Sequence, residues 1–268
     1  MTYTQIIKSS FAGFFLGCFF ALTIFGQSQK TYQNTLKLLS EMNDQISSSD
    51  KLAKLFRVGD ERIADLLKAL DDPNPDISRR AQIVIRYLGN NTGVKGLFEW
   101  YDKQKQFPVA GPIPLPLTEW DYKVIHAQYI NEPPEKWERS ESYIYALALD
   151  GSPKAKEALE KMIKIAGNLD EATVANRAVK RVQASRPARI LTSKQDLAEL
   201  ARDNAFFVSP DDRKYTSARL LALNGAKDKA LVEVYINRGV LSEEWYHVVI
   251  QNGEQGWQFF SITQVAVS

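Results

Sequence analysis

An uncharged, mostly apolar run from Ser9 to Gly26 constrains this chain more than any other feature of its sequence. As a helix rising about 1.5 Å per residue it would span roughly 27 Å, close to the bilayer hydrocarbon thickness of about 30 Å. The run is therefore either a short transmembrane anchor or the core of a signal peptide. Small residues at Gly26 and Ser28 offer a cleavage site before Gln29. Whether the run is an anchor or a cleaved signal peptide, we expect residues 29–268 to be carried across a membrane.

A single cysteine, Cys18, lies inside this run. Gly17-Cys18 is similar to the end of a bacterial lipoprotein signal, but Phe15 stands where such a signal prefers a Leu-like residue. The apolar run also continues after the cysteine, so we expect an apolar membrane residue and not an acylation site. With only two histidines, His126 and His247, the chain has few ways to build a zinc site. No metal or cofactor is therefore predicted.

The composition is typical of a packed globular protein, with 44% hydrophobic and 25% charged residues over 268 positions. Lys plus Arg is 34 and Asp plus Glu is 32, so the net charge of +2 creates no overall field for nucleic acid. No nucleic-acid partner is predicted. The chain contains no GxSxG, HExxH, GxGxxG, phosphate-loop or CxxC pattern. No catalytic residue is assigned, and a non-enzymatic protein is favoured over an enzyme.

Helical periodicity follows the membrane segment and is clearest over residues 62–90. An amphipathic helix and a linker are predicted over 29–56. Within 62–90, two helical stretches are divided by a turn in which Pro73 and Pro75 cannot continue a helix. Asp76 is expected to cap the second helix, and Gly89 is expected to end it in the left-handed conformation.

These residues resemble HEAT repeats. The matching positions are Leu66, Leu67 and Leu70 in the first helix, Asp72-Pro73 in the turn, and Arg80, Ala81, Ile85 and Leu88-Gly89 in the second helix. Two further units are less regular, one pairing 94–104 with 142–153 and one over 154–183. We predict a HEAT-like α-solenoid of about three helix pairs over 57–186. Tetratricopeptide repeats are the nearest alternative, but their Trp and Gly-Tyr spacing is absent.

The segment 106–138 interrupts the second unit and holds six of the eleven prolines. Its Trp and Tyr residues are Trp120, Tyr122, Tyr129 and Trp137. Such large side chains are costly to leave in water. The segment is either a structural strap that packs across the solenoid or the rim of a groove for a peptide or ligand. His126 is expected to be an ordinary packed or hydrogen-bonded side chain.

Residues 187–268 are predicted to form an α+β domain with a helix at 193–204. Period-two alternation predicts four strands, at 217–224, 230–237, 243–251 and 256–267, in an antiparallel meander. Val232, Val234 and Ile236 share one face with Tyr246, Val248 and Ile250, whereas Tyr235, Trp245, His247 and Val249 share the other. A sheet that is apolar on both faces needs two covers or a lined pocket.

The ending EEWYHVVIQNGEQGWQFFSI is similar to the last hairpin of NTF2-like proteins, in which a curved sheet and helices enclose a pocket. That resemblance implies a small-ligand or enzymatic pocket. Its lining would include Tyr235, Trp245, His247 and Trp257, with Glu233 as a further polar residue.

A cluster of basic residues lies between the repeats and the sheet. It comprises Arg177, Lys180, Arg181, Arg186, Arg189 and Lys194, with no acidic residue in this stretch. A solvated face is the favoured interpretation, ahead of anionic lipid headgroups or an acidic protein.

Taken together, the sequence predicts an α+β protein that is extracytoplasmic, with residues 1–28 as a membrane anchor or signal peptide. A single-pass membrane protein is favoured over a secreted or periplasmic one. The favoured function is a non-enzymatic protein-binding scaffold with an unidentified protein partner. The alternative is a small-ligand or enzymatic pocket in the C-terminal domain.

Overall fold

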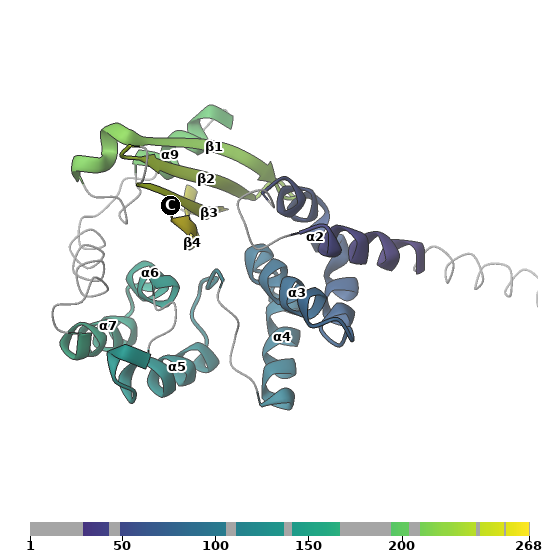
Figure 1. The fold of residues 1–268 in the computed structure, drawn as a ribbon, viewed down its shortest axis with the longest axis horizontal. Coiled ribbons are helices and arrows are strands. Elements are labelled where there is room, and N and C mark those ends of the chain that lie inside the picture. Colours follow the sequence, from purple (N-terminus) through teal and green to yellow (C-terminus); the bar gives the residue numbers. More distant parts are fainter. Residues whose placement is uncertain are drawn as a thin grey trace, which may run out of the picture.

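The computed structural model describes residues 29–42, 49–105, 111–136, 141–166, 194–203, 210–239, 242–254 and 256–267. Over these residues the chain is α+β, with helices followed by a four-stranded antiparallel sheet, as predicted (Figure 1). Among the helices of these residues, none combines the length and apolarity needed to span a membrane. The apolar run at 9–26 lies outside the described residues.

In the first group of helices, each helix from α2 (Ser49–Ala69) to α4 (Asn91–Gln104) contacts the next one along the chain. After a helical stretch at 29–40, the group comprises α2, α3 (Pro75–Leu88) and α4. α2 starts before the expected repeat boundary at 57, because Leu52, Leu55 and Phe56 continue its buried stripe. α4 contacts α2 and α3, so the expected partnership of 94–104 with 142–153 is not the main contact of either stretch.

At the two ends of α3, one prediction from the sequence is confirmed and the other is wrong. Gly89 ends the helix in the left-handed conformation at φ 55°, as expected. The expected cap at Asp76 is wrong, because the Asn74 side chain accepts from the Asp76 backbone N–H at 3.0 Å. Pro75 then occupies the first turn, where its missing N–H has no cost.

The second group of helices begins inside the Pro- and aromatic-rich segment. It comprises α5 (Glu119–Ile125), the π-helix η2 (His126–Ile130), the short 3-10 helix η3 (Pro134–Lys136), α6 (Glu141–Asp150) and α7 (Pro153–Ala166). α6 packs against α7 and against the last strand of the sheet. The boundary predicted at 186/187 falls outside the described residues.

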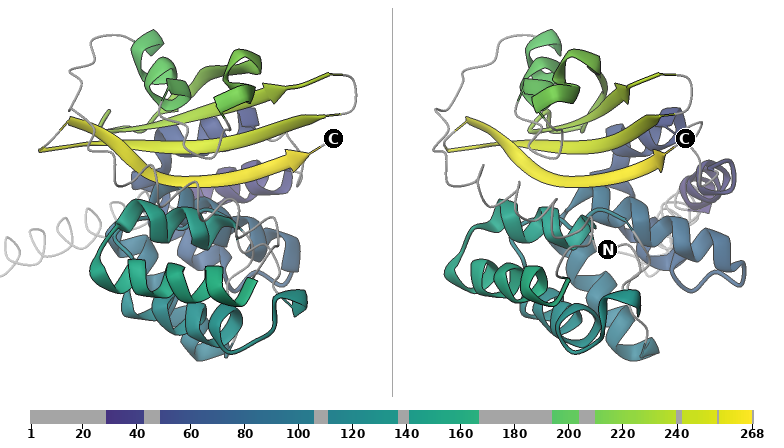
Figure 2. Two further views of the ribbon diagram at one scale, coloured as in Figure 1. Left: turned by 90° about the vertical axis from the view of Figure 1, so that its left-hand side faces the viewer. Right: turned by 60° about the vertical axis from the view of Figure 1, so that its left-hand side comes forward.

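The sheet follows α9 (Lys194–Asp203) and the 3-10 helix η4 (Pro210–Tyr215). Its strands are β1 (Thr216–Leu223), β2 (Lys229–Asn237), β3 (Glu243–Gly253) and β4 (Gly256–Val267). They pair in the order β1-β2-β3-β4, each antiparallel to the next, which confirms the predicted meander. Bulges interrupt β1 between Leu220 and Ala222 and the β3–β4 ladder at two places. In both views of Figure 2, α9 lies above α5–α7. α9 contacts β1 and β2 and α6 contacts β4, and both helices belong to the same core.

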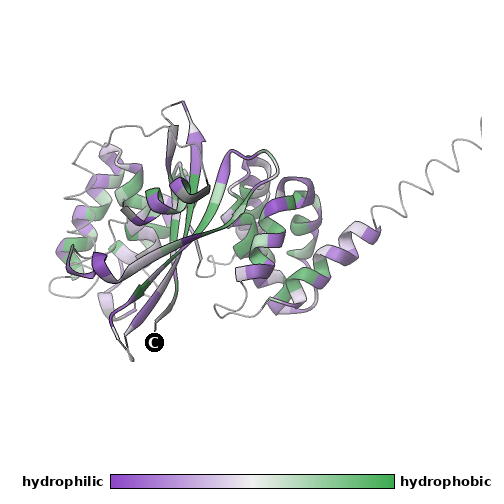
Figure 3. Ribbon diagram, turned by 90° about the horizontal axis from the view of Figure 1, so that it is seen from above, coloured by the Kyte–Doolittle hydropathy of each residue, from purple (hydrophilic) through white to green (hydrophobic). Residues whose placement is uncertain are grey.

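Both faces of the sheet are covered by helices, which is one of the two arrangements that its apolar faces allowed. Val232, Val234 and Val248 belong to the same buried core as α6, α7 and α9. Leu231 and Val249, on the other face, belong to the core of α2, α3 and α4. Figure 3 shows that the middle of the sheet is hydrophobic and its ends are hydrophilic. The sheet therefore joins two cores, and both groups of helices pack against it.

Candidate functional site

An open groove of about 630 Å³ runs along β1, the first strand of the sheet. We call it the β1 groove. It is lined by Arg57 of α2, Ala198 of α9, residues 218–223 of β1, and Asn224, Gly225 and Lys227 of the following turn. Because α2 and α9 belong to different cores, the groove lies where the two helical covers of the sheet meet its edge.

β1 forms an edge of the sheet, since among the described residues it pairs only with β2. The opposite edge, on β4, differs because the Leu115 backbone N–H donates to the Phe260 carbonyl at 3.2 Å. A bulge at Leu221 ends the regular part of β1, and Arg57 donates to the Leu221 carbonyl at 2.9 Å. The stretch from Thr216 to Leu220 therefore offers outward-facing backbone groups that another strand could pair with.

The charged residues that line the groove are all cations. They are Arg57, Arg219 and Lys227, and all three are exposed. Two carboxylates close to the turn, of Asp60 and Asp228, accept hydrogen bonds from Asn224 and do not line the groove. The β1 groove is thus a locally positive surface on a chain with almost no net charge.

A buried polar network lies behind Arg219, on the face of the sheet that α2 and α3 cover. Arg219 Nε donates to Glu233 Oε1 at 2.9 Å, and the Ser49 hydroxyl donates to Glu233 Oε2 at 3.0 Å. The Ser49 Oγ is also 3.1 Å from His247 Nε2, and the Tyr87 hydroxyl is 3.0 Å from His247 Nδ1. Apart from Arg219, each of these side chains is buried.

The electrostatics of this network keep Glu233 ionised. Burial raises the pKa of the Glu233 carboxyl, but the neighbouring His247 and the hydrogen bonds from Arg219 and Ser49 outweigh it and lower the pKa to about 2. His247 Nε2 is 3.9 Å from Glu233 Oε2, too far for a hydrogen bond, so we attribute most of the effect to Arg219 and Ser49. α2 also begins at Ser49, and the N-terminus of a helix favours a nearby anion.

The contact between Ser49 and His247 is superficially similar to a nucleophile and its base. In that chemistry a carboxylate orients the base through the second ring nitrogen, but here that nitrogen contacts Tyr87. Glu233 instead contacts Ser49, and both Ser49 and His247 are at most 4% exposed. The hydrogen bonds of the network connect α2 and α3 to the sheet.

The predicted aromatic site on segment 106–138 is largely part of the core. Tyr122 and Tyr129 are buried, and the Tyr129 ring lies 5.4 Å from that of Tyr143. Trp120 is half-buried and stacks on Phe98 at 4.7 Å and on Tyr101 at 5.1 Å. Trp137 lies outside the described residues. The expectation that His126 is packed is wrong, because this side chain is exposed. These contacts support the strap over the binding rim.

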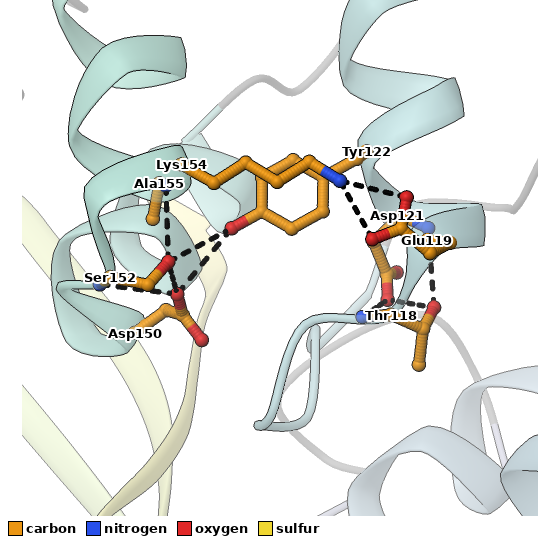
Figure 4. Close-up of polar contacts among 8 residues, drawn as sticks. All are labelled: Thr118, Glu119, Asp121, Tyr122, Asp150, Ser152, Lys154 and Ala155. Atoms are coloured by element: carbon orange, nitrogen blue, oxygen red, sulfur yellow. Dashed lines mark hydrogen bonds and ion pairs between the residues drawn. The ribbon is translucent and has the colours of Figure 1, made fainter.

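Polar contacts around Tyr122 tie α5 to α7 (Figure 4). Lys154 contacts both carboxylate oxygens of Glu119 at 2.7 Å and lies 4.1 Å from the centre of the Tyr122 ring. The Tyr122 hydroxyl is 3.3 Å from the Ser152 hydroxyl, which accepts from the Ala155 backbone N–H at the start of α7. Each polar group serves a cap or a contact between helices, so the cluster is explained by packing.

The remaining predicted residues do not gather into one pocket. Tyr235 and Trp245 are cross-strand partners whose rings lie 4.8 Å apart, and both are half-buried. Trp257 packs against the core that contains α6 and α9, whereas His247 lies in the buried network on the other face. Of the predicted basic cluster, Lys194 begins α9. The other five residues, Arg177, Lys180, Arg181, Arg186 and Arg189, lie outside the described residues.

A comparison of the chain with protein-family models, curated proteins and solved structures finds no match. The HEAT-like and NTF2-like resemblances therefore stay predictions. Within the described part of the chain, no three His, Cys, Asp or Glu side chains are placed to hold a metal ion.

The β1 groove is a feature that sequence reasoning missed. The alternation of residues 217–224 predicts a strand, but it does not say which edge of the sheet remains open. Ser49 falls within the helix and linker predicted over 29–56, which indicates no role for it, and it is the first residue of α2. A possible signal was the pair Arg219 and Glu233, which sit opposite each other if β1 and β2 form a hairpin.

Proposed function

We propose that this protein is an extracytoplasmic, non-enzymatic protein-binding scaffold that is tethered to a membrane by residues 1–28. The tether rests on the apolar run at 9–26 alone. The binding surface that we assign to the scaffold is the β1 groove. It replaces the aromatic segment 106–138 as the preferred site.

One observation carries this proposal. Among the described residues, β1 pairs with a strand on one side only, at the edge of the sheet (Figure 1), and a groove lined by residues of α2, α9 and β1 runs along it. An extended peptide can add a strand to such an edge, so that main-chain hydrogen bonds give affinity and the groove walls contact alternate side chains. Soluble proteins usually protect an open edge with bulges or charges. Here the bulge and Arg57 occupy the part of β1 that follows Leu220, and Arg219 is the charged side chain on the part before it.

The alternative, a small-ligand or enzymatic pocket under the sheet, has one supporting observation. Ser49, Glu233 and His247 are brought together, and these residue types occur in catalytic sites. Their burial and the contact of the second histidine nitrogen with Tyr87 favour the structural interpretation. We therefore favour the protein-binding scaffold over the small-ligand or enzymatic pocket.

Peptides selected from a random displayed library on the full chain, held in detergent or lipid nanodiscs, would test the scaffold. Each selected peptide would then be N-methylated on alternate residues, in two complementary patterns. Strand addition to β1 predicts that one pattern abolishes binding and the other leaves it intact, because only one edge of the peptide faces β1. Equal effects of the two patterns, or no selected peptide, would contradict the proposal.

A further inference from the structure

We infer that the β1 groove selects an extended protein segment rich in Asp and Glu. This inference rests on the proposed function and adds the chemistry of the partner. Its basis is the charge of the groove, where the described lining residues include the cations Arg57, Arg219 and Lys227 and no carboxylate. A segment with alternating acidic residues would place its carboxylates along this wall while its backbone pairs with β1.

Among these three cations, Arg219 is the best placed to bind a carboxylate of the partner segment. Its place on β1 puts it next to the backbone edge that would pair with the partner, and 64% of its side chain is exposed. Within the described part of the chain, Glu233 contacts Arg219 through the Nε hydrogen, which leaves the two terminal amino groups of the guanidinium for a ligand carboxylate.

The buried network explains why Arg219 is positioned in advance. Glu233 cannot easily move, because Ser49 holds its second oxygen at the start of α2 and the carboxylate lies against His247. A guanidinium held on a fixed carboxylate loses less freedom when a ligand binds. Glu233 offsets one positive charge, whereas Arg57 and Lys227 have no ion pair with a described carboxylate.

Two other occupants fit the same groove less well. A second copy of this chain, paired edge to edge along β1, would bring two Arg219 side chains towards each other, and like charges oppose that contact. An anionic lipid headgroup would satisfy the cations but would leave the backbone edge of Thr216–Leu220 unused. A protein segment with acidic side chains uses both features.

The test compares two synthetic peptides on the full chain, one alternating Val with Asp and the other alternating Val with Asn. We expect the acidic peptide to bind at least tenfold more tightly at low salt, and we expect added NaCl to reduce this difference. Equal affinities would overturn the inference and leave the proposed function standing. If neither peptide binds, the proposed function and the inference both fail.

Substitutions inside and outside the groove test which residues bind the acidic peptide. Arg219→Gln should weaken binding of the acidic peptide about tenfold. Lys227→Asn should weaken it about threefold, and this change is safe for folding because Lys227 is exposed at φ 60°, a conformation that Asn tolerates. Lys95→Gln, on the exposed face of α4 and outside the groove, is the matched control and should change nothing. Equal losses in all three variants would contradict the inference.

Two further outcomes would also overturn the assignment. The first is tight binding to vesicles that contain phosphatidylglycerol, lost in Arg219→Gln, together with no preference for the acidic peptide. The second is a concentration-dependent dimer that Arg219→Gln stabilises, which would indicate that β1 pairs with a second copy. Neither outcome is expected.

Discussion

The Ser49 hydroxyl, at the first residue of α2, donates a hydrogen bond to the Glu233 carboxylate on β2 at 3.0 Å. This contact joins the first group of helices to the sheet across 184 positions of the chain. It also fixes the carboxylate that holds Arg219 in the β1 groove. The stability of the fold and the shape of the groove therefore depend on the same buried hydrogen bonds.

Ser49→Ala should destabilise the fold by about 1–3 kcal/mol. The substitution removes a partner from Glu233 and from His247, both of which are buried and cannot be compensated by bulk water. Urea unfolding at pH 7 measures the effect. Ser40→Ala, which removes an exposed hydroxyl bonded to the Lys37 carbonyl, is the control and should change the unfolding free energy by less than about 0.5 kcal/mol.

Glu233 predicts a specific pH dependence of stability. Its pKa is lowered in the folded state from 4.5 to about 2. The ionised carboxylate therefore stabilises the fold above pH 4.5, and this stabilisation is lost as the pH falls from 4.5 towards 2. The full contribution is no more than about 3 kcal/mol, because His247 is too far from Glu233 for the hydrogen bond that would complete the shift. The difference in unfolding free energy between the wild type and Glu233→Gln should shrink over this window; a difference that does not vary with pH would refute this assignment.

Trp120→Ala separates the strap from the rim interpretation of segment 106–138. Because its ring stacks on Phe98 and Tyr101, we expect a loss of about 3 kcal/mol in thermal or urea unfolding. Tyr215→Ala is the control, since Tyr215 is 45% exposed, and it should have little effect. Unchanged stability of Trp120→Ala together with loss of a bound partner would favour the rim.

Gly89→Ala should destabilise the fold by at least about 2 kcal/mol. Gly89 has a φ of 55°, and a Cβ there would lie 2.2 Å from the Phe260 side chain on β4. The left-handed conformation and the close contact both oppose a side chain. Gly253→Ala, whose Cβ would meet nothing within 4 Å, is the matched control for urea unfolding. A variant as stable as the wild type would mean that α3 and β4 are not packed this closely.

The sequence predicted the sheet well because the relevant signals are local. Period-two alternation predicted each strand start to within one residue. The helix expected at 193–204 and the left-handed Gly89 were equally local signals. Helix start signals were less decisive, since Asn74 and Asp76 both fit a cap and only the backbone geometry distinguishes them.

The candidate site could not be predicted in the same way. Ser49 and Glu233 come together only through packing of α2 on the sheet, and no spacing in the sequence indicates that contact. The aromatic residues of 106–138 were the obvious candidates for a surface, but a hydrophobic side chain is suited equally to a core and to a binding site. The open edge of β1 depends on which strand ends the sheet, which is a property of the whole fold.

The most direct test of the account is amide hydrogen exchange of the full chain with and without the Val-Asp peptide. Strand addition to the β1 groove predicts slower exchange at amides within Thr216–Leu220, because their outward N–H groups would gain partners. The same experiment with Arg219→Gln should show much weaker protection at an equal peptide concentration. Protection confined to segment 111–136, with β1 unchanged, would contradict the central claim.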